Sequence, residues 1–335
     1  MGLLGQERAE QTLLRAHASG RLPHAWLFLG MGGIGKATLA LRFARYLLAG
    51  GGDSLDLPAD HPVARQVAAG AHPDLVIVRP KAPTRDQPRA RAEVPIDAVR
   101  LAIDRLQRTA VGAHRVLVVD RAHLLNNNAA NALLKLLEEP GEGVVIILTA
   151  EAADRFPPTI HSRVATLRLR RVEPSLIESW LRERFEIEPL TAHAAATIGA
   201  GSPGLALALA EASVHEHYAT LASLLGDGGR EPDVVGAVER LESILQSLDP
   251  GLFRALLGRL LRRTIGARLD EPVAELVTDE QARLRVLGRR LDRVWRLWDN
   301  LARLEDEAER FSLDRRLVLV DIATDLVGAE PALPA

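Results

Sequence analysis

The stretch "FLGMGGIGKATLALRF", residues 28–43, decides the fold, because it sets a glycine-rich turn between an apolar run and an amphipathic segment. Gly30, four further residues, and then Gly35 and Lys36 fit the nucleotide-binding pattern G-x-x-x-x-G-K-[ST]. The glycines, Gly33 among them, would let backbone N–H groups converge on phosphate oxygens, and Lys36 would reach the outer phosphates. We predict a strand, a loop of the phosphate-binding type and a helix. The simpler alternative is a glycine-rich turn with no ligand.

The loop departs from its pattern at the position that normally ligates magnesium, where a hydroxyl is expected and Ala37 stands. Thr38 is next, but one step along a helix turns a side chain by about 100°. Asp120 ends the apolar run 114–120 and is predicted either to hold magnesium or to cap the following turn. Arg121 then occupies the place of a water-activating glutamate, and arginine cannot accept a proton. We therefore expect negligible hydrolysis, with weak binding of ATP or ADP with magnesium left open.

Apolar runs and amphipathic segments alternate along the first half of the chain. The predicted strands are residues 24–30, 73–80, 114–120, 143–150 and 165–170, and the predicted helices are 3–18, 36–50, 95–110 and 127–140. This alternation favours an α/β fold whose parallel sheet is covered on both faces. Residues 80–93 are rich in Pro and Arg and are predicted to form an exposed loop. After residue 171 the pattern predicts helices only, interrupted at prolines and at "GSPG" (201–204).

Composition excludes several classes of protein. The 335 residues carry a formal net charge of -2 and no cysteine, so disulfides, cysteine zinc sites and catalytic thiols are ruled out. The near-neutral charge gives no reason to expect a free-standing nucleic-acid binder. No apolar run is long enough to span a membrane, and a cytoplasmic protein is expected.

Five segments taken together resemble the delta-prime subunits of bacterial DNA polymerase III clamp loaders, which are proteins of the AAA+ class. These segments are "GQERAEQTLLRAHASGRLPHAWLFLG", "GIGKATLALRFARYLLAG", "HPVARQVAAGAHPDL", "NNNAANALLKLLEEP" and "PPTIHSRV". The resemblance covers residues 5 to about 210. It implies an AAA+ nucleotide-type domain at 1–170, a helical lid at 171–212, a helical collar for oligomerisation at 213–328 and a flexible tail at 329–335.

The same resemblance implies a function and partners. Such a subunit sits in a five-subunit ring with gamma/tau-type ATPase subunits and a delta-type subunit, and the ring loads the sliding clamp onto primed DNA during replication, at forks on the nucleoid. It does not run the ATP cycle itself. Arg163, in Ser162-Arg163-Val164, matches the family's arginine finger, which reaches ATP held by the next subunit. The simpler alternative for Arg163 is a surface arginine in an arginine-rich chain.

Other positions depart from what the family usually carries. Residues 49–76 hold none of the cysteines that bind a structural zinc, so no zinc is expected, and His61 and His72 are predicted to be turn residues. Gly204 stands where active relatives have a nucleotide-sensing arginine. The family's sensor threonine falls at Ala150 or, one residue earlier, at Thr149.

Two further features are open between alternatives. Residues 283–304 are predicted to form one helix with Leu284, Leu287, Leu291, Val294, Trp298 and Leu301 on a single stripe. That stripe would face the core or an interface, and Trp295 beside it would be the better interface residue if exposed. Asn126 to Asn128 would either cap a helix or let its first N–H groups touch DNA phosphates.

Two functions compete with the non-hydrolysing subunit. A self-sufficient motor, such as a helicase loader or an active clamp-loader ATPase, would need Thr38 to replace the missing hydroxyl. Ala37, Arg121 and Gly204 all argue against it. A small-molecule kinase using the same loop lacks an acceptor site and leaves the long helical half unexplained.

Overall fold

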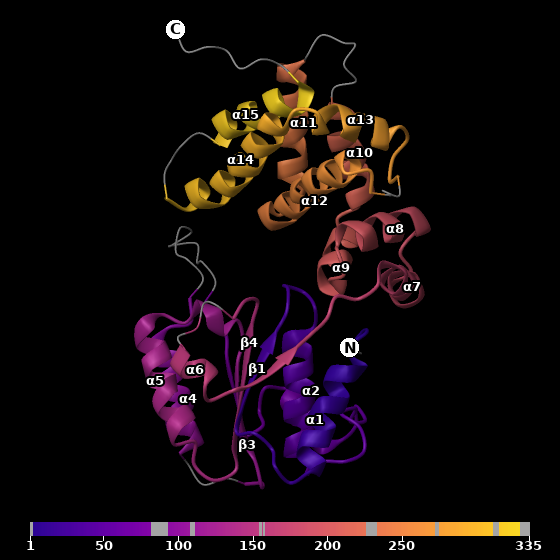
Figure 1. Ribbon diagram of the computed structural model, residues 1–335. Coiled ribbons are helices and arrows are strands. Elements are labelled where there is room, and N and C mark those ends of the chain that lie inside the picture. The colour runs from indigo at the N-terminus through magenta and orange to yellow at the C-terminus, as the bar shows by residue number, and fades with distance from the viewer. Residues whose placement is uncertain are drawn as a thin grey trace. The chain divides into compact units, whose positions relative to one another are not determined.

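A computed structural model describes residues 3–81, 93–107, 111–153, 156, 158–225, 233–271, 275–310 and 315–328, without the side chains of 158, 302–310 and 315. The predicted tail, 329–335, and most of the predicted loop, 80–93, lie outside these residues. The chain divides into two compact units, shown in Figure 1. The first comprises Met1–Glu173 with Ser202–Gly204, and the second comprises Pro174–Gly201 with Leu205–Ala335. The division of the second unit into a lid and a collar stays a prediction.

The first unit is built on a five-stranded parallel sheet, which confirms the predicted α/β fold. Its strands are β1 (Ala25–Leu29), β2 (Leu75–Val78), β3 (Arg115–Val119), β4 (Val144–Ala150) and β5 (Ala165–Arg168), in the order β2-β3-β4-β1-β5. Every residue of the central strands β1 and β4 is buried, as expected where helices cover both faces. This burial explains why these strands are continuous apolar runs and do not alternate.

Helices cover the sheet on both sides, with α1 and α2 on one face and α4 and α5 on the other (Figure 1). The helices of this unit are α1 (Glu7–Ala18), α2 (Lys36–Leu48), α3 (Pro62–Ala68), α4 (Ile96–Leu106), the 3-10 turn η1 (Ala122–Leu124), α5 (Asn127–Glu138) and α6 (Pro158–His161). Trp26 packs edge-on against Phe43 of α2, while its neighbours Ala25 and Leu27 join the core under α4 and α5. Alternate residues of β1 thus anchor the two helical layers.

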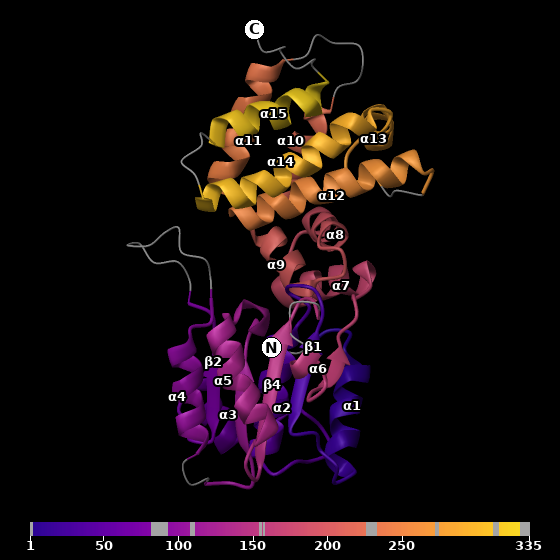
Figure 2. The ribbon, with the colours of Figure 1, turned by 60° about the vertical axis from the view of Figure 1, so that its left-hand side comes forward.

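The second unit is helical, and the structure shows no strand in its described residues. Its helices are α7 (Pro174–Phe185), α8 (Pro189–Ile198), α9 (Pro203–Glu211), α10 (Val214–Leu224), α11 (Val234–Ser247), α12 (Pro250–Arg268), α13 (Glu280–Gly288), α14 (Leu291–Arg310) and α15 (Arg315–Val327). Figure 2 shows α12, α14 and α15 side by side. Pro174, Pro189 and Pro250 each begin a helix, where the missing N–H costs nothing. None of the described helices is long and apolar enough to cross a membrane.

The prediction of one helix over residues 283–304 was wrong. The chain breaks after Gly288 and restarts at Leu291, so the two halves do not share one helical phase. The buried stripe of α14 is Val294, Leu297 and Leu301. Leu291 and Trp298 are partly exposed, at 45% and 39%, because they lie roughly 100–120° around the helix from the fully buried Leu297, at the edge of the buried face.

A buried ionic cluster joins three helices of the second unit. The Glu280 carboxylate accepts two hydrogen bonds from Arg263, one from the Tyr218 hydroxyl at 2.5 Å and one from the Leu276 N–H at 2.6 Å. Burial by itself would raise the pKa of Glu280, but these hydrogen bonds outweigh it and hold the pKa below its ordinary value. The cluster therefore ties α13 to α10 and α12 with an ionised carboxylate at its centre.

We predict that Glu280→Gln lowers the free energy of unfolding by about 3–5 kcal/mol at neutral pH, because it leaves Arg263 buried without its counter-charge. The folded-state pKa of Glu280 lies below the unfolded value. Its contribution is therefore present above the unfolded pKa and is lost as the pH falls through the folded pKa. Urea unfolding should show that the difference in free energy of unfolding between the wild type and Glu280→Gln narrows below about pH 4. Glu239→Gln, which changes an exposed residue of α11, is the control, and a pH-independent difference in the free energy of unfolding would contradict the assignment.

Candidate functional site

The predicted glycine-rich loop joins the carboxyl end of β1 to the first turn of α2, as the sequence pattern requires. Gly33 and Gly35 both have positive φ, at 72° and 103°, in the region that favours glycine. A Cβ on Gly35 would collide with Cδ1 of Leu3, so the N-terminal segment lies against the loop. The glycines are therefore required both by backbone conformation and by a close approach.

Lys36 does not extend away from the loop. Its ammonium donates hydrogen bonds to the carbonyl oxygens of Gly30 at 2.6 Å and Met31 at 2.7 Å, and the residue is only 7% exposed. Burial lowers the pKa of Lys36, and the charges of Glu151 and Asp120 oppose that effect. The lysine that would bind phosphate is thus engaged by the loop's own backbone.

The predicted "GSPG" segment closes over the same loop. The Ser202 hydroxyl donates to the carbonyl oxygen of Gly32 at 2.8 Å, and the Gly204 N–H donates to that of Gly33 at 2.9 Å. A Cβ on Gly204 would lie 2.8 Å from the Gly33 oxygen and 3.0 Å from its Cα. Gly204, predicted as the site of a missing sensor arginine, therefore sits where any larger residue would have to move the loop.

Asp120 lies at the end of β3 and is held by its neighbours. Its Oδ1 accepts hydrogen bonds from the Thr149 hydroxyl at 2.6 Å and from the Arg121 N–H at 3.1 Å. The Thr149 hydroxyl in turn accepts from the Arg121 N–H at 2.9 Å. Thr149 thus places a hydroxyl beside Asp120, and its assignment as the sensor threonine stays a prediction. Arg121 has a positive φ of 50° and an exposed side chain, and it supplies no acid beside Asp120.

The remaining loop positions add no magnesium ligand in this arrangement. Ala37 and Thr38 are the second and third residues of α2, which begins at Lys36. That Thr38 does not replace the missing hydroxyl stays a prediction. With Lys36 turned inward and Arg121 beside Asp120, the residues as placed do not fit a magnesium–nucleotide.

Arg163 lies between α6 and β5 and is partly exposed, at 34% of its side chain. Its Nη1 donates to the Thr159 carbonyl at 2.9 Å and to the Ser162 hydroxyl at 3.2 Å. Its Nη2 pairs with Glu138 Oε1 at 2.9 Å. Val164 beside it packs against the core, which fixes the backbone of the motif. Arg163 is thus a surface residue with a defined side-chain position.

Arg163 and the glycine-rich loop lie at opposite ends of β1. Ala165, two residues after Arg163, pairs with Trp26 near the amino end of β1, whereas the loop begins after Leu29 at its carboxyl end. Four residues of extended strand correspond to about 13 Å. The sheet register therefore places the two features at opposite ends of β1, too far apart for Arg163 to act on a ligand at the loop of its own chain.

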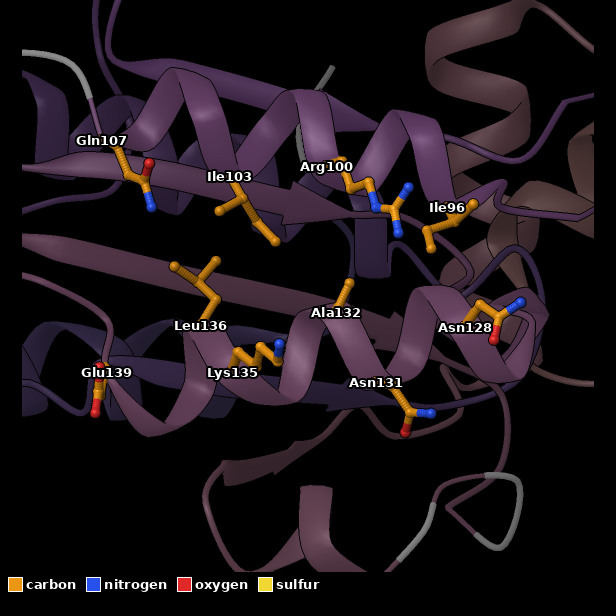
Figure 3. A pocket seen from close by; sticks show the side chains of 10 residues that line it. All are labelled: Ile96, Arg100, Ile103, Gln107, Asn128, Asn131, Ala132, Lys135, Leu136 and Glu139. Atoms are coloured by element: carbon orange, nitrogen blue, oxygen red, sulfur yellow. The ribbon is translucent and has the colours of Figure 1, made fainter.

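An open groove of about 660 Å³ lies between α4 and α5. Figure 3 shows Arg100, Lys135, Asn128 and Asn131 along it, with Glu139 at its other end. Asn126, just before α5, accepts a hydrogen bond from the Ala129 N–H at 2.9 Å and so caps this helix. Capping was one of the two roles predicted for Asn126 to Asn128. A contact with phosphates stays a prediction.

Histidines in the region of the family's zinc site act as turn residues, as predicted. His61 caps α3 by accepting from the Val63 N–H at 3.2 Å, and His72 accepts from the Asp74 N–H at the same distance. Within the described parts of the chain, no group of three or more His, Asp or Glu side chains could hold a metal ion.

Sequence reasoning missed two contacts of the site. The closure of the loop by Ser202 joins residues 170 positions apart, so no local pattern announces it. The pairing of Glu138 with Arg163 could have been suspected from "LLEEP" and "HSRV", but two glutamates stand there and the sequence does not distinguish Glu138 from Glu139.

A parallel sheet with a glycine-rich loop after β1, together with a helical second unit, defines an AAA+ type of protein. A solved structure of a DNA polymerase III gamma-subunit-related protein from Thermotoga maritima has this fold, with a TM-score of 0.50, 16% identity, and coverage of 95% of this chain and 98% of that one. A family model described as "DNA polymerase III, delta subunit" matches residues 5–173, about half of the chain. The chain belongs to this DNA polymerase III delta-subunit family, which confirms the predicted resemblance.

Two curated relatives refine the comparison. The chain is 32% identical to the DNA polymerase III subunit delta′ of Pseudomonas aeruginosa over 62% of this chain and 63% of that protein. It is 28% identical to a DNA polymerase III subunit gamma of Buchnera aphidicola over 54% of this chain and 47% of that protein. The matched part thus spans from under half to just under two thirds of each relative.

We predict that Gly204→Ala destabilises the first unit by about 1–3 kcal/mol, because the new methyl group forces backbone away from backbone. Hydrogen exchange of the amides at residues 30–36 should accelerate together with the loss in urea stability. Gly112→Ala is the matched control, since its Cβ would meet only Asp74 Oδ2 at an ordinary 3.6 Å. Equal behaviour of the two variants would show that the Gly204 contact is not tight.

Proposed function

We propose that this chain is a non-hydrolysing subunit of the DNA polymerase III clamp loader, and that Arg163 acts on ATP held by a neighbouring subunit. The observation that carries the proposal is the separation of Arg163 from its own loop by the length of β1. A partly exposed guanidinium at that edge is available to a second molecule. Such a group offsets negative charge on the transferring phosphoryl group, which typically accelerates hydrolysis by roughly 10³- to 10⁵-fold.

The chain's own loop supports the other half of the proposal. Lys36 and the carbonyls of Gly32 and Gly33 are satisfied within the protein, and Ala37 and Arg121 supply neither a hydroxyl nor a base. A positioned general base contributes roughly 10²- to 10⁴-fold in rate, so its loss together with the magnesium ligand leaves hydrolysis negligible. The chain then needs no nucleotide, magnesium or zinc of its own.

The partners follow from the same proposal. Gamma/tau-type ATPase subunits and a delta-type subunit would complete a five-subunit ring, which opens the sliding clamp and places it on primed DNA in the cytoplasm, at forks on the nucleoid. DNA would be met through the assembled ring, chiefly at its phosphates. The exposed Asn127 and Asn128 at the start of α5 are the groups of this chain proposed to take part.

A self-sufficient motor is the second candidate, favoured by the similarity to a gamma subunit. Three positions speak against it, namely Ala37, Arg121 and Gly204. The contact of Gly204 with Gly33 adds a physical reason, because a sensor arginine could not enter at position 204 without displacing the loop. Sustained phosphate release by the isolated chain would favour the motor.

We predict that Arg163→Ala abolishes hydrolysis at one site of a complex reconstituted with its ATPase partner. The rate at that site should fall by at least about a hundredfold, because the finger acts only in the transition state. Arg163→Lys should fall almost as far, since an ammonium lacks the planar fork. The measurement is the amount of ATP hydrolysed per complex in a single DNA-stimulated turnover.

Arg65→Ala, which removes an exposed arginine of α3, is the matched control and should leave every site active. Circular dichroism and urea unfolding should show that the isolated Arg163→Ala chain folds as the wild type does. Unchanged hydrolysis in a correctly assembled complex would refute the finger role.

We also propose that α14 contributes to assembly of the ring. Trp295 is 72% exposed, so it does not belong to the core, and it lies one turn before Trp298. The Arg262 guanidinium lies 6.0 Å from the centre of the Trp298 ring, which gives a cation–π contact at this surface. Exposed tryptophans commonly anchor protein interfaces.

We predict that Trp295→Ala weakens association with partner subunits about tenfold or more without changing the stability of the isolated chain. Sedimentation of the reconstituted complex over a range of concentrations measures the effect. Val235→Ala removes an equally exposed apolar side chain, 71% exposed, from α11 of the same unit. Identical association of both variants with the wild type would exclude Trp295 from the interface.

A further inference from the structure

The Arg163 guanidinium is held by acceptors on two helices. Thr159 belongs to α6, where its carbonyl also accepts from the Ser162 hydroxyl at 3.1 Å, and Glu138 is the last residue of α5. The carboxylate of Glu138 is 51% exposed, so the pair is accessible to solvent. The side chain of Arg163 is therefore fixed from two directions at the protein surface.

The hydrogen bonds of Arg163 leave two N–H donors of its guanidinium unused within the described residues. Nη1 serves Thr159 and Ser162, and Nη2 gives one hydrogen to Glu138. Nε has no partner among the residues that the structure describes, and Nη2 keeps a second hydrogen. Nε–H and one hydrogen of Nη2 are therefore left as donors for the oxygens of a phosphate.

We propose that Glu138 is a positioning residue for Arg163, holding its unused donors in place for the phosphates of a neighbouring subunit. The inference rests on the proposed function of Arg163. An unrestrained arginine loses side-chain freedom when it binds, and a guanidinium already oriented by fixed acceptors loses less. Glu138 acts through orientation and does not itself touch the nucleotide.

The adjacent Glu139 distinguishes this role from a general effect of negative charge. Both glutamates precede Pro140, at the end of α5. Glu139 lines the groove between α4 and α5 (Figure 3), whereas Glu138 pairs with Arg163. The two residues are adjacent and carry the same charge, but only Glu138 pairs with Arg163, so Glu139 is the matched control.

The test uses the full chain reconstituted with its ATPase partner and measures kcat and KM for ATP at the site served by Arg163. Glu138→Ala should lower kcat about tenfold with an unchanged KM, because the finger contributes in the transition state and a misplaced group loses that contribution. Glu138→Gln keeps an acceptor oxygen in place and should recover most of the rate. Glu139→Ala should behave as the wild type.

A double-mutant cycle provides the readout that a merely structural role would not give. In an Arg163→Ala background, Glu138→Ala should cause no further loss, since its effect passes through the arginine. A loss as large as in the wild-type background, or a Glu138→Ala rate equal to or above the wild type, would overturn the inference. If Arg163→Ala alone has no effect, the proposed function itself fails, so the two failures are distinguishable.

Discussion

The arrangement of this protein depends on the burial of β1 between β4 and β5. Parallel pairing fixes Leu29 beside Ala150 and Trp26 beside Ala165. The first pair sets the start of the glycine-rich loop, and the second sets the position of Arg163. A slip of one residue would exchange the side chains that face the two helical layers. Because Trp26 and Ala25 differ greatly in size, close packing of the core specifies the register. The distance between loop and arginine is therefore a consequence of core packing.

The loop itself is stabilised by its own protein. A phosphate-binding loop normally keeps its lysine and its backbone donors ready for an anion. Here the Lys36 ammonium donates hydrogen bonds to two loop carbonyls. Ser202 and Gly204, which are distant in the sequence, donate to two more. The lysine that a phosphate would otherwise engage is therefore held by carbonyl oxygens of its own loop. These contacts support the proposal that this fold has kept its shape while its nucleotide chemistry has passed to a neighbour.

Local sequence patterns predicted the first unit well. The five strands were evident because buried parallel strands are continuous apolar runs, and the loop motif fixed the start of α2. The helices α1, α2, α4 and α5 were also predicted, whereas the short helices α3 and α6 were not. The second unit was predicted only as helical. Its helix break at Gly288 escaped notice because apolar spacing on both sides happened to agree. The candidate site was predicted as a set of residues, but its contacts were not, since Ser202–Gly32 and Glu138–Arg163 depend on tertiary structure.

The most direct measurement is equilibrium binding of MgATP to the isolated chain, combined with phosphate release from the same sample. A ligand that binds the folded state raises the free energy of unfolding by RT ln(1 + [L]/Kd), about 2.7 kcal/mol at a hundredfold excess over Kd. The proposed loss of nucleotide chemistry predicts no such rise at millimolar MgATP and no sustained phosphate release. Saturable stabilisation accompanied by steady turnover would contradict it.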